Sequence, residues 1–344
     1  MSGEAACPVC GRSRWRLHLQ MGTRRLERCA GCGLIVTAPP LTRADLAGLY
    51  EEGYYSETGA VRFRLGLAER AMRLFRRRRA AAIRRLLPGS SRVLDVGCGR
   101  GYMLRALQDW GHEVHGTQLS SVAVRFAREH LGLAHIFQGD LWDAAYPDGW
   151  FDFISLYHVF EHLPDPGEQL RELYRILKPE GLLYIEVPNS ASLSARWLGP
   201  HWLAWDLPRH LCHYDPATLS EIGARFGFQP VRRSFLSLEY SPATLLFSLV
   251  SAVFRDENWL FRYLTGGLSA TESPQAGRAG LGARLAVRMT VALILAAPAI
   301  AASLLLAACR RGDTIGIYFR RQPVRSGCAG LPRTAVLRRE ASPA

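Results

Sequence analysis

The chain has 344 residues, of which 48% are hydrophobic, enough for one large α/β domain with a substantial core and further additions. Its formal net charge is +13, and the positive charge is almost entirely arginine, since Lys178 is the only lysine. This balance favours acidic partners such as phosphates, nucleic acid or an anionic membrane, although arginine spread over solvated faces gives the same composition. No charged segment followed by an apolar one opens the sequence, which argues against a signal peptide and predicts a cytoplasmic protein.

Two cysteine pairs lie within residues 1–38. Cys7 and Cys10 form one C-x-x-C motif and Cys29 and Cys32 form a second, with 18 residues between the two motifs. Such pairs in an intracellular chain indicate metal binding rather than disulfides, and four thiolates complete the tetrahedron of a structural Zn²⁺ ion. The sequence therefore predicts a small zinc knuckle without an open position for catalysis. Four reduced thiols without a metal are the alternative.

A linker is expected at residues 39–61, and residues 62–87 have the pattern of an amphipathic helix. Phe75 and Ile83 belong to its apolar face. Arginines occupy most of its remaining surface: Arg76, Arg77, Arg78, Arg84 and Arg85. A solvated face is the simplest interpretation, and contact with anionic lipid or RNA is the alternative.

Strands and helices alternate along the next hundred residues, which is typical of a doubly wound α/β sheet. The expected strands are residues 92–96, 113–117, 134–138, 151–157 and 182–187. Asp165, Pro166 and Glu168 supply an N-cap, a first-turn proline and a capping-box acid for the helix that precedes the last of these strands.

The turn after the first strand carries glycine at every second position. Asp95 stands in the strand, and Gly97, Gly99 and Gly101 follow it before a helical pattern begins at Tyr102. Glycine lets a ligand approach the main chain, and the N–H groups at the start of a helix suit an anionic group. The third glycine comes one residue too early for the dinucleotide fingerprint G-x-G-x-x-G, so the turn departs from that motif.

Two further strands are expected at residues 226–236 and 312–321, and both belong to the same sheet. The apolar insertion between them, residues 237–311, contains two uncharged segments. Residues 241–254 are too few to span a bilayer, whereas residues 289–309 are enough by length alone.

A single crossing by residues 289–309 would leave the last strand on the wrong side of the membrane. Pro298 is expected to bend this segment, and arginines flank both of its ends. We therefore expect a monotopic anchor on the cytoplasmic leaflet, with a soluble helix buried in a dimer as the alternative. Residues 322–344 are expected to form a disordered basic tail.

Four motifs resemble those of the class I S-adenosylmethionine-dependent methyltransferases. They are residues 95–101, 139–140, 160–166 and 177–181. The motifs are most similar to those of ubiquinone-biosynthesis O-methyltransferases and of zinc-knuckled sugar C-methyltransferases. The resemblance implies a seven-stranded Rossmann-like sheet over residues 62–236 and 312–321, S-adenosylmethionine as cofactor, and a methyltransferase activity.

The resemblance also implies which residues bind the cofactor. Asp140 would accept a hydrogen bond from the adenine amino group. Where this chain has Gln118, the family usually has an acid that accepts hydrogen bonds from both ribose hydroxyl groups. A neutral amide still bonds one or two hydroxyl groups, so this departure concerns affinity more than cofactor identity. The implied cofactor-binding residues are Asp95, Gly97, Gly99, Gly101, Gln118, Asp140 and Leu141.

His158, Glu161 and His162 follow the fourth strand at helical spacing, so they can share one face. In the quinone methyltransferases a metal-binding acidic cluster lies here, so the resemblance implies either catalysis or a second, divalent metal ion. Local hydrogen bonds that hold this loop are the alternative. H-x-x-E-H is also a zinc-protease motif, but that motif lies on a helix, whereas here a strand and a short loop are expected.

Residues 190–220 follow the fifth strand, where acceptor-recognition segments lie in the resembled family. His210 and His213 are the first candidates for a catalytic base, because histidine titrates near neutrality. Arg209 and Tyr214 are the candidates for binding the acceptor, with Arg209 suited to an anionic group. An insertion that only covers the sheet is the alternative.

Three functions follow from these observations. The first is a membrane-associated methyltransferase that acts at O or C of a lipid-linked or amphipathic acceptor. The second is an RNA methyltransferase that uses the knuckle and the arginine helix, which predicts a steep salt dependence but leaves the apolar insertion unexplained. The third is a non-catalytic, membrane-docked module.

Overall fold

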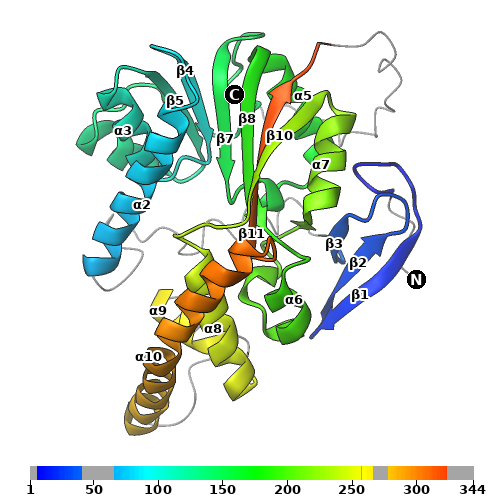
Figure 1. Cartoon of the computed structure of the whole chain (residues 1–344), viewed down its shortest axis with the longest axis vertical. Coiled ribbons are helices and arrows are strands. Elements are labelled where there is room, and N and C mark those ends of the chain that lie inside the picture. Colours follow the sequence, from blue (N-terminus) through cyan, green and yellow to red (C-terminus); the bar gives the residue numbers. More distant parts are fainter. Residues whose placement is uncertain (1–5, 41–65, 257, 266–277, 324–344) are drawn as a thin grey trace, which may run out of the picture.

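The structure, a computed structural model, describes residues 6–40, 66–256, 258–265 and 278–323. In this part of the chain a seven-stranded sheet has the order β10-β11-β8-β7-β4-β5-β6, and a four-stranded sheet has the order β1-β2-β3-β9 (Figure 1). The predicted linker at residues 39–61 and the predicted tail at residues 322–344 lie almost wholly outside the described residues.

The predicted doubly wound sheet is confirmed. Its strands are β4 (Arg92–Val96), β5 (Glu113–Gln118), β6 (Ile136–Gln138), β7 (Phe151–Tyr157), β8 (Leu177–Pro188), β10 (Phe228–Ser234) and β11 (Thr314–Arg321). Strands β4 to β8 are parallel, whereas β11 is antiparallel to both β8 and β10 and lies between them. β8 begins at Leu177 rather than at residue 182, because Leu177 already pairs with Phe151 of β7.

Helices cover both faces of this sheet (Figure 1). They are α2 (Gly66–Arg84), α3 (Tyr102–Asp109), α4 (Ser121–Arg125) with the turn η1 (Phe126–His130), α5 (Pro166–Ile176) and α7 (Pro216–Arg225). Because alternate residues of a strand face opposite sides, Val93 shares a buried cluster with Ile83 of α2 and Leu104 of α3. Its neighbour Leu94 shares the other cluster with Leu173 of α5.

The cysteine-rich N-terminal segment forms an antiparallel ribbon that packs on the main domain. Its strands are β1 (Trp15–Met21), β2 (Arg24–Cys29) and β3 (Ile35–Ala38), and its fourth strand, β9 (Cys212–His213), comes from the segment between β8 and α7. That segment also contains α6 (Leu193–Leu198), η3 (Gly199–His201) and η4 (Leu203–Trp205). Trp202 and Trp205 are buried against Leu26 and Ile35 of the ribbon.

The apolar insertion forms three helices, α8 (Ser241–Phe254), α9 (Trp259–Thr265) and α10 (Arg278–Ala308). α8 and α10 pack against each other, and α10 continues through Pro298 without a break. Its segment Gly282–Ala308 is long and apolar enough to cross a membrane by length and composition, and most of it is exposed. The insertion leaves the large sheet after β10 and returns at β11, at the edge where the parallel strands end.

Candidate active site

The glycine turn between β4 and α3 has the left-handed backbone that glycine permits. Gly97, Gly99 and Gly101 have φ angles of 70°, 56° and 80°. A Cβ atom on Gly97 or Gly101 would lie 2.4 Å or 2.5 Å from side chains of neighbouring segments, so these two glycines are needed for packing. Among the described residues, a Cβ atom on Gly99 would meet only Arg76, 3.4 Å from its Nη1 atom. Gly99 is therefore the position at which the main chain is most open to a ligand.

The other residues predicted for cofactor binding lie at the carboxyl edge of the sheet. Asp95 in β4 is buried and accepts a hydrogen bond from Ser155 Oγ at 2.7 Å, and burial raises its pKa to about 6. Gln118 ends β5, and Asp140 follows β6, where two backbone N–H groups of the next turn donate to its Oδ1 atom. Leu141 is buried in the core below this edge.

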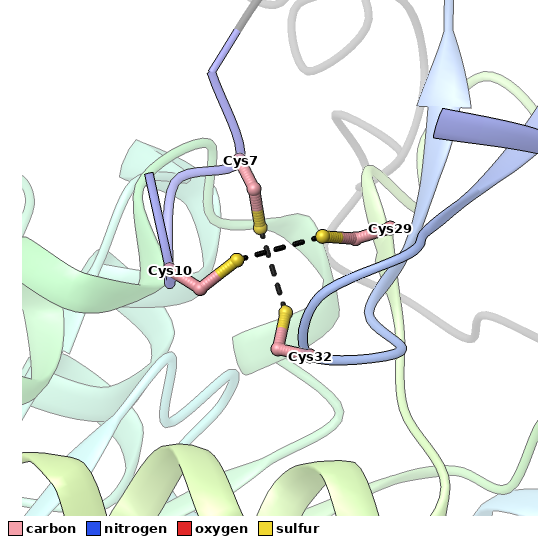
Figure 2. Close-up of side chains that lie close together, drawn as sticks. All are labelled: Cys7, Cys10, Cys29 and Cys32. Atoms are coloured by element: carbon pink, nitrogen blue, oxygen red, sulfur yellow. Dashed lines mark hydrogen bonds between the residues drawn. The ribbon is translucent and has the colours of Figure 1, made fainter. Parts of the chain in front are cut away.

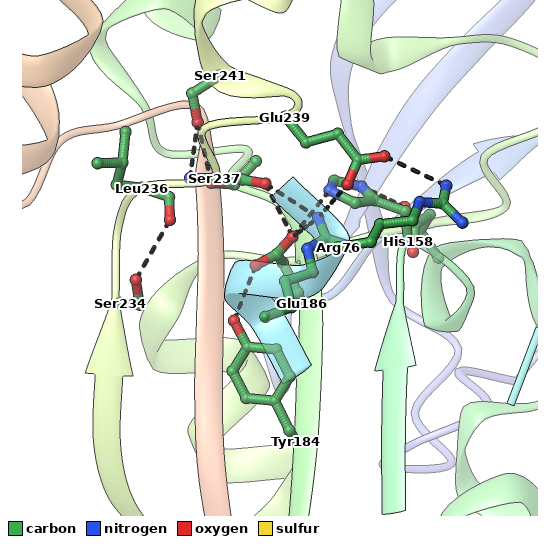
Figure 3. A network of polar contacts seen from close by, with 12 residues as sticks. Arg76, His158, Tyr184, Glu186, Ser234, Leu236, Ser237, Glu239 and Ser241 are labelled. Atoms are coloured by element: carbon green, nitrogen blue, oxygen red, sulfur yellow. Dashed lines mark hydrogen bonds and ion pairs between the residues drawn. The ribbon is translucent and has the colours of Figure 1, made fainter. Parts of the chain in front are cut away.

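A buried network of ion pairs crosses the same edge (Figure 3). Arg79 of α2 lies 3.0 Å from Glu186 Oε1 in β8 and 3.1 Å from Glu239 Oε2. Arg76, one turn earlier in α2, lies 3.3 Å from Glu239 Oε1, and Tyr184 donates to Glu186 Oε2 at 2.8 Å. The network therefore joins α2, the end of β8 and the segment that leads into α8.

His158 is the centre of this network. Its Nδ1 atom lies 3.2 Å from Glu161 Oε1, its Nε2 atom lies 3.4 Å from Glu186 Oε1, and its ring lies 3.9 Å from that of Tyr240. Burial alone would lower the pKa of His158, but the two carboxylates outweigh burial and raise the pKa to about 9. At neutral pH His158 is therefore an imidazolium with both nitrogens facing carboxylates, which makes it a poor proton acceptor.

A second cluster brings together three predicted site residues from two segments. Candidate ligand atoms of Glu161, His162 and His210 all lie within 4.8 Å of one another. His162 Nδ1 lies 3.0 Å from the Arg209 carbonyl oxygen, and His210 Nδ1 lies 2.9 Å from the Ala204 carbonyl oxygen. A carbonyl accepts only from an N–H group, so each neutral imidazole carries its lone pair on Nε2. Glu161 Oε2 is buried and has no hydrogen-bond partner in the described part of the chain.

This cluster lies beside the glycine turn. Val159, two residues before Glu161, fills the space next to Gly97, where its Cγ2 atom would be 2.4 Å from an added Cβ atom. Burial and the neighbouring His210 lower the pKa of His162 to about 4, so this imidazole is neutral at physiological pH. The arrangement suits proton transfer or a divalent cation, because one carboxylate and two imidazoles converge.

The remaining candidates in residues 190–220 lie outside this cluster. His213 is buried in β9 with its Nε2 atom 3.1 Å from Thr37 Oγ1 of β3, and burial lowers its pKa well below the usual value. Arg209 is half-buried and donates to Asp206 Oδ1 at 2.6 Å. Tyr214 is fully buried, with its ring stacked on Phe160. Of the two predicted bases, only His210 lies beside Glu161.

The four N-terminal cysteines converge as their spacing predicts (Figure 2). Sγ of Cys7 lies 3.6 Å from Sγ of Cys32, and Sγ of Cys10 lies 3.5 Å from Sγ of Cys29. Four sulfur atoms at these separations surround a point at which a tetrahedral Zn²⁺ ion fits, with Zn–S distances of about 2.3 Å.

We expect the purified protein to contain one zinc ion per chain, held by these four thiolates. Cys10→Ser should lose this zinc and lower the melting temperature, because three thiolates bind zinc less tightly and the ion joins the two turns of the N-terminal segment. Elemental analysis and thermal unfolding measure both effects. Cys309→Ser, which removes an exposed thiol, is the matched control and should keep the zinc. Zinc-free wild-type protein of unchanged stability would contradict the assignment.

Sequence reasoning missed Arg79, Glu186 and Glu239. Two signals were available: Glu186 interrupts an otherwise apolar strand, and Arg79 precedes the core residue Ile83 by one helical turn. A charge at a core-facing position needs a partner. The arginine face of α2 is also divided, because Arg76 points at Glu239 whereas Arg77 and Arg78 are exposed.

Comparisons with known proteins agree with this geometry. Residues 67–233 match a methyltransferase-domain family. The ubiquinone biosynthesis O-methyltransferase of Thiobacillus denitrificans is 29% identical over 170 residues, which are 46% of this chain and 72% of that protein. The protein of the same name from Xanthomonas oryzae pv. oryzae is 34% identical over 138 residues, which are 38% of this chain and 57% of that protein.

Among solved structures, a SAM-dependent methyltransferase from Archaeoglobus fulgidus is 22% identical, with a TM-score of 0.42 over 71% of this chain and 94% of that one. The match to the family covers residues 67–233, so the ribbon strands β1 to β3, the apolar insertion and β11 lie outside it. The matched family, the relatives and the glycine turn at the carboxyl edge lead to one conclusion. Residues 67–233 of the chain form a class I S-adenosylmethionine-dependent methyltransferase domain.

Proposed function

We propose that the protein transfers a methyl group from S-adenosylmethionine to an oxygen or carbon atom of a lipid-linked or amphipathic acceptor at the cytoplasmic surface of a membrane. One observation supports an acceptor that lies in or at a membrane. The apolar insertion begins and ends at the edge of the sheet that carries the glycine turn, because Ser234 pairs with Gly316 and Thr314 pairs with Pro188. A bilayer that holds the insertion therefore lies close to the reacting groups.

The residues at this edge fit the cofactor. The open main chain at Gly99 suits the methionine part of the cofactor, and Asp95 suits its ammonium group. Gln118 suits the ribose, and Asp140 suits the adenine. Gly97 and Gly101 give the turn its left-handed backbone, and Leu141 packs in the core below it. The bound cofactor supplies an electrophilic methyl group on a sulfonium. The protein then contributes mainly position, because a displacement of this kind needs an aligned acceptor and little covalent help.

An O–H or C–H acceptor must also lose a proton. His210 is the proposed base, because its Nε2 atom lies 4.0 Å from Glu161 Oε1 and 3.8 Å from Asp206 Oδ2, so these carboxylates can stabilise the imidazolium that forms. Glu161, His162 and His210 also suit a divalent cation, which would polarise the acceptor oxygen when bound. Arg209 remains the proposed contact for an anionic group on the acceptor.

Label partitioning tests the proposal. Purified protein is incubated with methyl-labelled S-adenosylmethionine and lysate of its source cell, and the label is divided between organic extract, RNA and aqueous small molecules. We expect label in the organic extract, and none with the Gly99→Arg variant. Label in RNA would overturn the acceptor class and would make the exposed arginines of α2 the surface to test by salt dependence.

We expect Glu161→Gln to reduce methyl transfer by about 100-fold, the usual scale for losing a group that assists proton transfer. If a divalent cation binds there, dialysis against a chelator should lower wild-type activity, and added Mg²⁺, Mn²⁺ or Zn²⁺ should restore it only when Glu161 is present. Glu221→Gln is the control, since Glu221 is an exposed carboxylate of α7 paired with Arg225. Equal activities of the two variants would remove Glu161 from the mechanism.

A further inference from the structure

The surface of α10 determines how the insertion meets the membrane. We infer that α10 lies flat on an anionic bilayer with one long face immersed, rather than crossing the bilayer or entering it with its N-terminal end first. The inference rests on the membrane association proposed above, and it names the binding surface and its orientation.

The immersed face is a continuous apolar stripe. Leu293, Ile294 and Leu305 are 71%, 68% and 65% exposed, which is unusual for large apolar side chains in water. The exposed large apolar residues of α10 are Val287, Leu293, Ile294, Ile300, Leu304 and Leu305. At about 100° per residue they fall within an arc of about 140°, so they share one side of the helix. The opposite side packs on α8 and α9 through Ala292.

Charged side chains lie along the first third of α10, which argues against insertion of its N-terminal end. Arg288 of α10 is buried against the turn after α8 and forms an ion pair with Asp256 at 2.9 Å. Arg255 is exposed at the same turn, and the Arg284 guanidinium lies 4.8 Å from the ring of Trp259. Entry of this end of α10 into hydrocarbon would carry these charges with it, at a cost of several kcal/mol.

The charges at both ends of the helix fit an anionic headgroup layer. Arg310 and Arg311 are exposed just beyond the C-terminal end of α10, and Arg284 lies near its start. Residues 278–312 contain no aspartate or glutamate. Cations at both ends and apolar side chains between them are the pattern of a helix that lies in the plane of the interface.

Depth measurements on bound protein separate the orientations. Val287, Ile294 and Leu305 lie within about 20° of one another around the helix, while the first and last are about 27 Å apart along it. Each is replaced by cysteine in a Cys309→Ser, Cys328→Ser background, labelled with a nitroxide and bound to vesicles of phosphatidylglycerol and phosphatidylcholine. Paramagnetic relaxation should report similar depths at all three positions. A steady change of depth along the helix, or exposure to water at all three, would overturn the inference.

A binding assay tests the surface without using methyl transfer, so its failure is distinct from failure of the proposed activity. The Ile294→Glu, Leu305→Glu double variant should bind phosphatidylglycerol vesicles at least about tenfold more weakly than wild type, whereas Leu17→Glu, the same change at an exposed site on the ribbon, should bind as wild type does. Equal weakening by Leu17→Glu would overturn the inference. The inference would also be overturned if the wild-type protein were a dimer that does not bind vesicles and if the double variant were a monomer. A second copy of the chain would then cover the stripe.

Discussion

Replacing Gly99 with alanine should weaken the binding of S-adenosylmethionine by about 100-fold, or about 2.8 kcal/mol, while leaving the protein folded. The methyl group enters the one place in the turn where the main chain is open, 3.4 Å from Arg76 Nη1. The left-handed φ of 56° adds strain of about 1–2 kcal/mol for an L side chain. Isothermal titration calorimetry with S-adenosylmethionine measures the loss of affinity.

Gly111→Ala is the matched control for this experiment. Gly111 also has a left-handed backbone, with φ of 85°, but its Cβ atom would meet no atom of the described residues within 4 Å. The control should therefore lose similar stability and keep its affinity for the cofactor. Equal affinities of the Gly99 and Gly111 variants would show that the cofactor does not approach the turn at Gly99.

Arg79→Ala should lower the free energy of unfolding by about 3–5 kcal/mol, because it leaves Glu186 and Glu239 buried beside each other without their shared cation. Urea denaturation at pH 7 measures the change. Arg78→Ala, one position earlier on the exposed side of α2, should change stability by less than about 0.5 kcal/mol. A small effect at Arg79 would mean that water replaces the ion pairs.

The loss at Arg79 should also depend on pH. Burial alone would raise the pKa of Glu186, but Arg79 and His158 outweigh burial and lower this pKa to about 2. Since the folded pKa lies below the unfolded value of about 4.3, the stabilisation is complete above pH 4.3 and disappears as pH falls toward 2. The difference between wild type and Arg79→Ala should therefore shrink over this acid range, and a constant difference would contradict the assignment.

Local sequence patterns predicted the parts of the molecule that depend on short-range physics. The glycine turn has the backbone that its spacing requires, and Asp165 caps α5 by accepting from the Glu168 N–H group at 3.0 Å. The two C-x-x-C motifs converge because each pair sits on one tight turn. In these cases the interacting residues are close in sequence or related by a repeated motif.

Pairings between distant segments were not predictable in the same way. Glu161 and His210 are 49 residues apart in the sequence, and Arg79 and Glu186 are 107 residues apart. Only the folded topology brings each pair together. The strand β9 is another case, because two residues are too short a pattern to indicate a strand. The sequence suggested that His213 was as good a base as His210, yet β9 directs His213 toward Thr37 in the ribbon.

The position of β11 has a consequence for how the protein is made. This strand comes last in the chain, yet it fills an interior place between β8 and β10. During synthesis from the N-terminus, the sheet must therefore keep two unpaired strand edges until residues 314–321 leave the ribosome, after the whole apolar insertion has emerged. The insertion, which we propose to bind the membrane, therefore emerges while the domain is still open. Completion of the sheet by β11 then fixes both ends of the insertion at the edge that carries the glycine turn.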